Sequence, residues 1–516
     1  MPSKLADIAR TTARGSLSLF LSGTLSTVIL AIGSIIIARL LGPEGYGLYH
    51  LSMTLPFILL TISSLGIDPA LTMFSARLRN EGKTWLVRSY LKLGLTFKLM
   101  VSLIASATGL MISDIFAAYV LGRPYLAFLI RLASSIVLFR AMFDAIGSAL
   151  IGLDRMGSAA VLAFLQSIAK TCLAPLLIIV GLGITGAITG YVLSYAITAP
   201  LGVAILYIKE IKEDEPSQAG NSLPLSEGVK SMVSYGLPLY SLTLLMALLG
   251  QYQLVVLANS ATDFEIGNFN VALNFTSLIN VLVTPIATIL FPAFSKLNPK
   301  DEIGELREMF SLSAKYSSLV VIPASTLVIL LSGDLVSLIY GASYVLAPLF
   351  LSLYVISFLY AGLGSLVLES FFNGIGRTGL TFRMRLVYAL TFIPLAFLLA
   401  KAYSATGLIM AILASRMASI VYGLAIADRE FGVRVNLYAS FRIYLTALLS
   451  AIPVLLLPAP HQLSHTLNLL VRAFLYILIY LTTLPYLKAI DRLDIENIRL
   501  AFSGLRIIQP VLKLLL

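Results

Sequence analysis

Residues 25–37 of the chain read LSTVILAIGSIII, a run of thirteen positions without a charged side chain. A strand of a membrane barrel would alternate between lipid-facing and lumen-facing side chains, and this run does not alternate. Only helices and closed barrels satisfy their own backbone hydrogen bonds inside a bilayer, so the run predicts a membrane-spanning helix. We place this helix at 16–38, because about 20 apolar residues cross the hydrocarbon core.

The rest of the sequence repeats this pattern. Of its 516 residues, 58% are hydrophobic and 12% are charged, and the mean hydropathy is +0.94. That is more apolar surface than a water-soluble fold can bury, so we expect an all-α, polytopic membrane protein with about 14 transmembrane helices. The apolar run that follows Lys4, Arg10 and Arg14 is too long for a signal peptide, so its helix should be retained. The predicted helices lie at 16–38, 48–74, 91–113, 126–150, 158–181, 184–208, 231–258, 266–293, 315–332, 346–372, 384–402, 405–427, 440–458 and 467–487.

The charge distribution predicts the orientation. Net charge is +11, and the basic residues lie mainly in every second loop, whereas the opposite loops hold only Arg39, Arg123 and Lys401. Cytoplasmic loops retain Lys and Arg, so we expect both termini in the cytoplasm and a multi-pass protein of the cytoplasmic membrane. Because the basic residues do not form one patch with interleaved aromatics, a nucleic-acid partner is not expected.

Cysteine and histidine give no metal site. Cys172 is the only cysteine and lies within a predicted span, and the three histidines, His50, His461 and His465, are far apart in the sequence. Neither a disulfide nor a set of metal ligands follows from these positions, so no cofactor is expected.

Two matches within the sequence predict two related halves. With a shift of 220 residues, Ala38 aligns with Ala258 and Gly47 with Gly267, and a second match at 222 pairs Arg155 with Arg377. The polar stretch between these halves is the longest in the chain and predicts a boundary. We therefore predict a first lobe of helices 1–6 at 1–208, a cytoplasmic linker at 209–230, a second lobe of helices 7–12 at 231–427, and helices 13 and 14 with an amphipathic, membrane-surface tail at 428–516. Transporters use such paired lobes to expose a central site to each side in turn.

Several charged residues fall in the middle of predicted spans, where a charge costs at least ~2.5 kcal/mol unless it faces a cavity or a partner. Arg140 and Asp144 stand four apart in helix 4, Lys170 lies midway along helix 5, and Arg416 midway along helix 12. If the three basic residues converge between the lobes, they form a cationic cavity that suits an anionic headgroup. A structural salt bridge to Asp144 is the alternative for Arg140.

Other charges lie nearer the helix ends. Arg39 closes helix 1, either as an interface anchor or at the mouth of the cavity. Lys98 and Arg472 are predicted to extend towards the interface. Asp68 and Glu369 lie near the inner ends of helices 2 and 10, and with Asp144 they are candidates for ion coupling or for structural roles.

Residues 38–49, ARLLGPEGYGLY, follow the apolar first helix and resemble the loop between helices 1 and 2 of Wzx-like polysaccharide transporters in the multidrug/oligosaccharidyl-lipid/polysaccharide (MOP) exporter superfamily. Residues 373–379, NGIGRTG, resemble the same branch. The resemblance implies a fold like that of MATE and MurJ proteins, with two six-helix lobes that rock about a central cavity. It also implies a flippase that moves a polyprenyl-(di)phosphate-linked oligosaccharide from the cytoplasmic to the outer leaflet, with membrane lipids and a coupling cation as further partners. Related lipid II flippases hold the diphosphate in an arginine-rich cavity and the lipid tail beside helices 13 and 14, which suggests substrate-binding roles here for Arg39, Arg140, Lys170 and Arg416.

Three other functions compete with this one. A cation-coupled drug or metabolite antiporter of the same superfamily should carry deep acidic residues, whereas the charges here are mostly basic. A major-facilitator carrier should have its basic signature between helices 2 and 3, and residues 75–82, SARLRNEG, lack it. A membrane glycosyltransferase or polymerase would need a large polar loop, and no loop exceeds about 20 residues. We therefore expect a transporter and not an enzyme.

Overall fold

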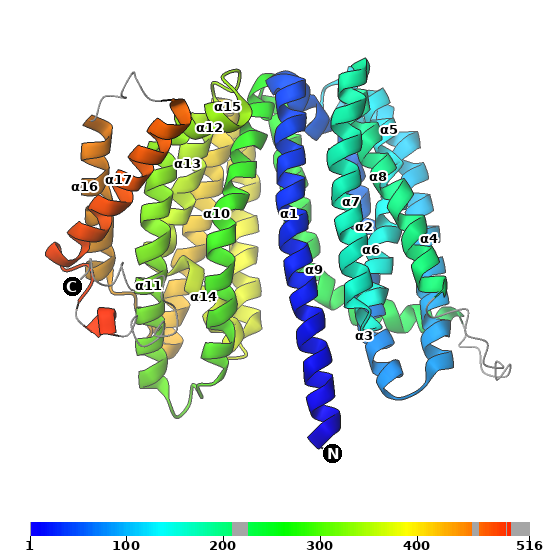
Figure 1. Ribbon diagram of the computed structural model, residues 1–516, viewed down its shortest axis with the longest axis horizontal. Coiled ribbons are helices and arrows are strands. Elements are labelled where there is room, and N and C mark those ends of the chain that lie inside the picture. Colours follow the sequence, from blue (N-terminus) through cyan, green and yellow to red (C-terminus); the bar gives the residue numbers. More distant parts are fainter. Residues whose placement is uncertain (1, 209–224, 457–463, 492, 497–516) are drawn as a thin grey trace. The chain divides into compact units, whose positions relative to one another are not determined.

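The structure of the chain is a computed structural model that describes residues 2–208, 225–456, 464–491 and 493–496. Every regular element among these residues is a helix, which confirms the predicted all-α class (Figure 1). The helices up to residue 260 are α1 (Pro2–Ser52), α2 (Thr54–Ser63), α3 (Ile67–Asn80), α4 (Thr84–Ile115), η1 (Phe116–Val120), η2 (Pro124–Leu126), α5 (Ala127–Ser134), α6 (Ile136–Gly152), α7 (Met156–Leu177), η3 (Ile178–Leu182), α8 (Gly183–Leu206) and α9 (Leu225–Ser260). The remaining helices are α10 (Asp263–Ser295), α11 (Ile303–Leu330), α12 (Ser332–Tyr340), α13 (Ala347–Leu359), η5 (Tyr360–Leu363), α14 (Ser365–Gly374), α15 (Thr378–Phe431), α16 (Leu437–Leu456) and α17 (His465–Tyr486).

The described residues contain nine helical stretches that are long and apolar enough to cross a bilayer. Three of them, Ser22–Asn80, Met156–Leu206 and Thr378–Phe431, have 59, 51 and 54 residues, enough for two crossings each. The nine stretches, with three of them counted twice, accommodate the 14 predicted spans when the broken pair α13 and α14 and the helix α10 are added. Large apolar side chains along these helices are exposed, such as Met111 (79%) and Ile179 (69%), as expected of a surface that lipid covers.

Some predicted loops are kinks inside continuous helical stretches. α1 runs through the predicted turn after helix 1 and leaves helical geometry at Gly42, where φ is 68°. Glycine tolerates this left-handed backbone, and Pro43, with its fixed φ and missing N–H, then fits the first turn of the next helical segment. α15 joins predicted helices 11 and 12 in the same manner, with non-helical residues at Tyr403 and Ser404.

Predicted helix 2, at 48–74, is broken. Leu65 and Gly66 have positive φ values of 46° and 74°, and they separate α2 from α3. The backbone of Gly66 packs directly on that of Gly236 in α9, where a Cβ on either residue would overlap the other's carbonyl group. Predicted helix 10, at 346–372, is likewise bent by 54° between η5 and α14, at Gly364. The predicted spans at 48–74 and 346–372 run through both breaks without showing either of them.

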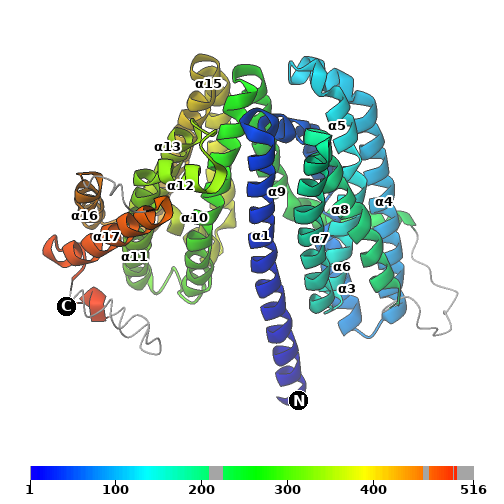
Figure 2. The same cartoon turned by 45° about the horizontal axis from the view of Figure 1, so that its top comes forward.

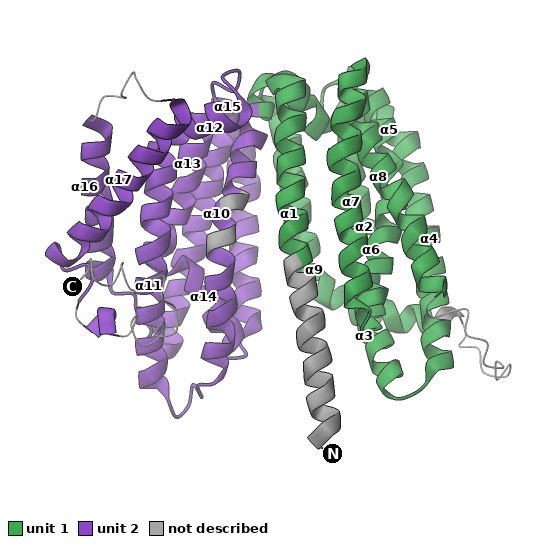
Figure 3. Cartoon of the chain, viewed as in Figure 1, with its two compact units in different colours: residues 1–267 green, residues 268–516 purple. Residues whose placement is uncertain are grey.

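The chain forms two compact units, Met1–Gly267 and Asn268–Leu516 (Figure 3). In the first unit, α4, α6, α7 and α8 lie side by side (Figures 1 and 2), and α1 packs on α7. Its core is built from Leu71, Leu91, Ala145 and Leu150, all at 0% exposure. Between α3 and α6 the Thr72 hydroxyl donates to the Ser148 carbonyl at 2.9 Å, a polar contact typical of close helix packing in membranes.

α9 is part of this first unit, because it packs on α2, α3 and α4. The boundary between the two compact units therefore falls after Gly267. The sequence instead predicts a lobe boundary at 209–230, and residues 209–224 lie outside the described residues. The lobe boundaries at 1–208, 209–230, 231–427 and 428–516 remain predictions.

The second unit contains an aromatic core in which Phe371 contacts Phe294 and Phe310 edge to face, with ring centroids 5.5 and 5.3 Å apart. The segment after α17 packs into this unit. Ala489 and Ile490 are buried beside α11, α16 and α17, so the start of the predicted surface tail is docked and not exposed. The rest of that tail, 497–516, lies outside the described residues.

Charged contacts fasten this C-terminal segment. Asp491 and Asp494 each accept the other's backbone N–H at 2.9 Å, and Lys315 of α11 forms ion pairs with both. Partial burial by itself would raise the pKa of Asp491, but the Asp494 N–H and the Lys315 ammonium group lower it below its usual value. Asp491 is therefore ionised at neutral pH.

Candidate functional site

Several cations within the described membrane spans have a carboxylate partner on another helix. Lys98 Nζ lies 2.9 Å from Asp68, Arg131 lies 2.5 Å from Asp114, and Arg472 lies 2.8 Å from Asp334. The prediction that Lys98 extends to the interface was therefore wrong, since Lys98 is 2% exposed. For Arg472, which is 20% exposed and paired with a residue of α12, it stays a prediction. Position along one helix shows the distance to the membrane surface but not a partner on another helix.

Arg140, on α6, has a different environment. Its Nη1 donates to the Tyr191 hydroxyl at 3.0 Å, and its guanidinium lies 5.2 Å from the ring centroid of Phe57 and 5.8 Å from that of Tyr195. The predicted pair with Asp144 is present, but its 3.8 Å separation is too long for a hydrogen bond. The Arg140 Nε is buried without a hydrogen-bond acceptor. This guanidinium thus retains unused hydrogen-bonding capacity.

Lys170, on α7, contacts the same tyrosine. Its Nζ lies 3.8 Å from the centroid of the Tyr191 ring, in cation–π geometry. Among the described residues it has no carboxylate within ion-pair distance. Tyr191 therefore holds two cations, one at its hydroxyl and one at its ring face. We call the group of Phe57, Arg140, Lys170, Tyr191 and Tyr195 the tyrosine–cation cluster.

Four helices supply this cluster: Phe57 comes from α2, Arg140 from α6, Lys170 from α7, and both tyrosines from α8. Tyr191 and Tyr195 are four residues apart and so share one face of α8, and their ring centroids are 5.6 Å apart. Tyr191 also meets Phe57 edge to face at 6.5 Å. The aromatic packing fixes the surfaces on which the two cations rest.

Arg416 belongs to the second unit. Its Nη1 donates to Ser357 Oγ at 2.8 Å and its Nη2 to the Tyr354 hydroxyl at 3.4 Å, and it lies over the Tyr354 ring at 5.5 Å. Here too an arginine within a span rests on a tyrosine and a hydroxyl, with no carboxylate among these contacts. Arg39, the fourth predicted binding residue, is exposed on α1, one turn before the Gly42 kink.

The predicted acidic residues have unequal partners. Asp68 accepts Lys98 Nζ on both oxygens, at 3.0 and 2.9 Å, and the Ser64 hydroxyl at 3.0 Å. Glu369 pairs with Arg385 at 2.8 Å. Both are thereby neutralised, whereas Asp144, with a side chain 42% exposed, has only the longer contact to Arg140.

A family model described as "Polysaccharide biosynthesis protein" matches residues 12–298, which is more than half of the chain. The chain belongs to this polysaccharide biosynthesis family. The matched residues include the whole tyrosine–cation cluster of the family member described here. A search of curated proteins finds no match to its sequence.

Solved structures place this family member in the fold of the MOP superfamily. It is similar to the lipid II flippase MurJ in an inward closed conformation, at 14% identity and a TM-score of 0.73, over 92% of this chain and 99% of that one. It is also similar to an inward-facing multidrug resistance MATE transporter (17% identity, TM-score 0.65, 79% and 94% covered) and to a MOP superfamily transporter from Pyrococcus furiosus (17%, 0.53, 82% and 95%). Family and fold together support a multi-pass membrane transporter.

For this family member, the sequence predicted cations within the spans but not the tyrosines that contact them. Tyr191, Tyr195 and Tyr354 lie in apolar runs where an aromatic residue is ordinary. One signal was present: the spacing of four between Tyr191 and Tyr195 puts two hydroxyl-bearing rings on one face of a span. This spacing indicates a site only once the fold brings Arg140 and Lys170 from other helices to that face.

Proposed function

We propose that this protein is a flippase that moves a polyprenyl-(di)phosphate-linked oligosaccharide from the cytoplasmic to the outer leaflet of the cytoplasmic membrane. The observation that carries the proposal is the pair Arg140 and Lys170, held on Tyr191 without a carboxylate at hydrogen-bond distance. Membership of a polysaccharide biosynthesis family supports a glycan cargo.

A phosphate group needs cationic donors to leave water, because an unpaired anion in hydrocarbon is costly. An aromatic face attracts a cation but does not neutralise its charge, so Arg140 and Lys170 keep their attraction for an anion. A phosphate oxygen would also give the Arg140 Nε the acceptor that it lacks. Arg416 is proposed as a third cation for the headgroup, and Arg39 as a fourth contact.

The proposed orientation has both termini in the cytoplasm, since the basic residues cluster in loops that this topology puts inside. In the proposed cycle the predicted lobes 1–208 and 231–427 rock against each other, which exposes the headgroup site to one side and then to the other. The polyprenyl tail stays in lipid throughout.

Asp144 is the proposed coupling residue, because Asp68 and Glu369 are already paired with Lys98 and Arg385. A partly exposed carboxylate beside Arg140 could exchange a proton or bind a cation when the anionic headgroup competes for the guanidinium. The same feature favours the second candidate function, a cation-coupled antiporter for drugs or metabolites. That function would not need the uncompensated Lys170.

The test measures flipping of a fluorescent lipid-linked oligosaccharide in proteoliposomes by Arg140→Gln, Lys170→Met and Arg416→Gln variants. Each substitution removes a charge-assisted hydrogen-bond donor worth about 1.5–3 kcal/mol, so flipping should fall by about tenfold or more in each. Arg131→Gln is the matched control, because it removes an arginine whose partner Asp114 is 61% exposed. Normal flipping in all three variants would reject the cationic site.

The same assay separates the two candidate functions. A flippase should move the diphosphate-linked lipid faster than an otherwise identical neutral glycolipid, and the difference should disappear in the Lys170→Met variant. Transport of an organic cation in place of either lipid would support the antiporter.

A further inference from the structure

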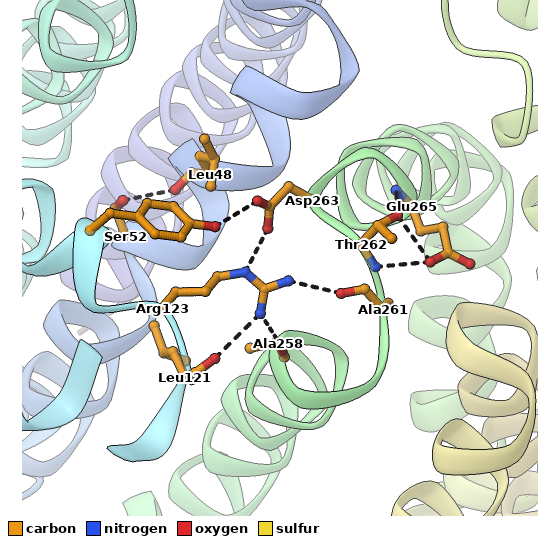
Figure 4. Close-up of polar contacts among 10 residues, drawn as sticks. Leu48, Ser52, Leu121, Arg123, Ala258, Ala261, Thr262, Asp263 and Glu265 are labelled. Atoms are coloured by element: carbon orange, nitrogen blue, oxygen red, sulfur yellow. Dashed lines mark hydrogen bonds and ion pairs between the residues drawn. The ribbon is translucent and has the colours of Figure 1, made fainter. Parts of the chain in front are cut away.

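Arg123 and its partners join two turns that are far apart in sequence. Its Nε donates to Asp263 Oδ1 at 2.6 Å, and its Nη2 donates to the Ala261 carbonyl at 2.8 Å (Figure 4). Its Nη1 donates to the carbonyls of Leu121 and Ala258. The side chain is 11% exposed and thus serves four acceptors in a largely enclosed position.

Each turn is rigid by itself. Before Arg123, Gly122 takes a φ of 65°, and the Arg123 backbone N–H donates to the Ala117 carbonyl at 2.7 Å, which sets the direction of the side chain. In the other turn, Thr262 and Glu265 bond reciprocally at 2.9 and 3.2 Å and cap the start of α10. Arg123 therefore binds a preformed surface at the end of α9, where terminal carbonyls favour a cation.

Two further side chains cross between the same turns. The Tyr125 hydroxyl donates to Asp263 Oδ2 at 2.7 Å, and Asn259 Nδ2 donates to the Val120 carbonyl at 2.7 Å. Together with Arg123 and Asp263 they form a group that we call the turn clasp. It satisfies both oxygens of Asp263 and four backbone carbonyls of the two turns.

A glycine contact lies directly beside the turn clasp. A Cβ on Gly47 would overlap the Asp263 carbonyl oxygen, and a Cβ on Gly267 would overlap that of Pro43. The positions in this reciprocal contact are related by the internal repeat. Residue 267 lies 220 positions after residue 47, and residue 263 lies 220 positions after residue 43. The two backbones therefore meet without side chains between them at these glycines.

The location of the turn clasp gives it a role in the cycle. The pairs Lys98–Asp68, Arg131–Asp114 and Arg140–Asp144 lie within the predicted lobe 1–208, and Arg385–Glu369 lies within 231–427. Arg123–Asp263 instead joins the predicted ranges 1–208 and 231–427, and both residues lie in the first compact unit, Met1–Gly267. In the proposed topology both turns lie on the outer side.

We propose that the turn clasp is a latch that keeps the outer ends of the two predicted lobes together and must release before cargo can leave to the outer leaflet. This inference rests on the alternating-access cycle of the proposed function. Release exposes a carboxylate and a guanidinium to water, where each is well solvated, so the latch is reversible. Weakening it should favour the outward-open form.

The test measures distances by pulsed electron paramagnetic resonance between spin labels at Phe128→Cys and Val345→Cys, in a Cys172→Ala background. Both labelled positions are exposed, at 62% and 65%, outside the turn clasp. Arg123→Gln should raise the ratio of long to short distances on the order of tenfold, as expected when a largely buried charge pair loses one member. Arg131→Gln, which removes an ion pair within one predicted lobe, should leave the ratio unchanged.

A second variant distinguishes loss of the ion pair from misfolding of the Arg123→Gln protein. Asp263→Asn keeps the shape of the turn and removes the charge, so it should shift the distances in the same direction as Arg123→Gln. Unchanged distances in both variants would overturn the latch. The measurement needs no cargo, so a shift in distance without flipping of any lipid would instead count against the proposed function.

A covalent link tests the opposite state. A short, reducible thiol cross-linker between Arg123→Cys and Asp263→Cys should stop flipping, and a reductant should restore it. Flipping that continues at the original rate after complete cross-linking would also overturn the proposal.

Discussion

Tyr191 shows how one neutral side chain can position two charges. Its hydroxyl accepts from Arg140 and its ring lies under Lys170, so its removal affects both cations at once. Tyr191 is itself only 7% exposed, which makes it a positioning residue of the proposed site and leaves the headgroup contacts to the cations.

We predict that Tyr191→Phe raises the lipid concentration needed for half-maximal flipping about three- to tenfold, because Arg140 loses a neutral hydrogen bond. Tyr191→Leu should raise it further, since Lys170 then also loses its ring. The maximal rate of Tyr191→Phe should stay near that of the unmodified protein. Tyr476→Phe is the control, as Tyr476 is also buried, at 1% exposure, and donates to the Ala447 carbonyl in the second unit. An equal effect in this control would show general destabilisation.

At this scale the sequence predicted the positions of the charges and a pair within one helix, but not the pairs between helices. The salt bridge of Arg140 with Asp144 was the alternative role for that arginine, and the two side chains lie 3.8 Å apart. Lys98 and Asp68 were not predicted as a pair, because they lie on α4 and α3 and meet only after those helices pack. Partners within one helix follow from the 3.6-residue period, whereas partners across helices need the fold.

Among the elements, the break between α2 and α3 is the one that depends most on glycine. Gly66 has a positive φ, and its backbone lies against Gly236, so two independent requirements exclude a side chain. A predicted straight helix across 48–74 is therefore replaced by two segments whose junction rests on α9.

We predict that Gly66→Ala destabilises the protein by about 3 kcal/mol, since it adds backbone strain to an overlap with Gly236. Thermal unfolding of the purified protein in detergent measures this loss. Gly250→Ala is the control on α9, because nothing lies within 4 Å of its added Cβ, and it should stay within about 1 kcal/mol. Similar melting temperatures for both variants would contradict the role of the glycine contact.

For the whole molecule, hydropathy and charge predicted the helical class and the spans that the fold accommodates, because both depend on composition along the chain. They did not predict that Gly42 and Ser404 would be kinks within continuous helices, or that α9 would pack with α2, α3 and α4. Those features depend on which surfaces meet, and one sequence does not encode that as a periodic pattern.

The orientation of the whole molecule gives a further prediction. In a Cys172→Ala background, a membrane-impermeant maleimide should label Val345→Cys on intact cells. It should label Leu493→Cys only after the membrane is opened, because the proposed topology puts residue 345 outside and residue 493 inside. Both positions are exposed, at 65% and 71%, so reactivity reports the side of the membrane. The reverse labelling pattern would invert the proposed direction of transport.

The two ion pairs that flank α17 bear on how a long prenyl chain would travel. Arg472 ties this helix to Asp334 of α12, and just beyond its other end Asp494 binds Lys315 of α11. Because these ion pairs tie α17 to α12 and the segment after it to α11, we expect α17 to move together with the second unit. A hydrocarbon tail lodged beside α16 and α17 would therefore move with the second unit.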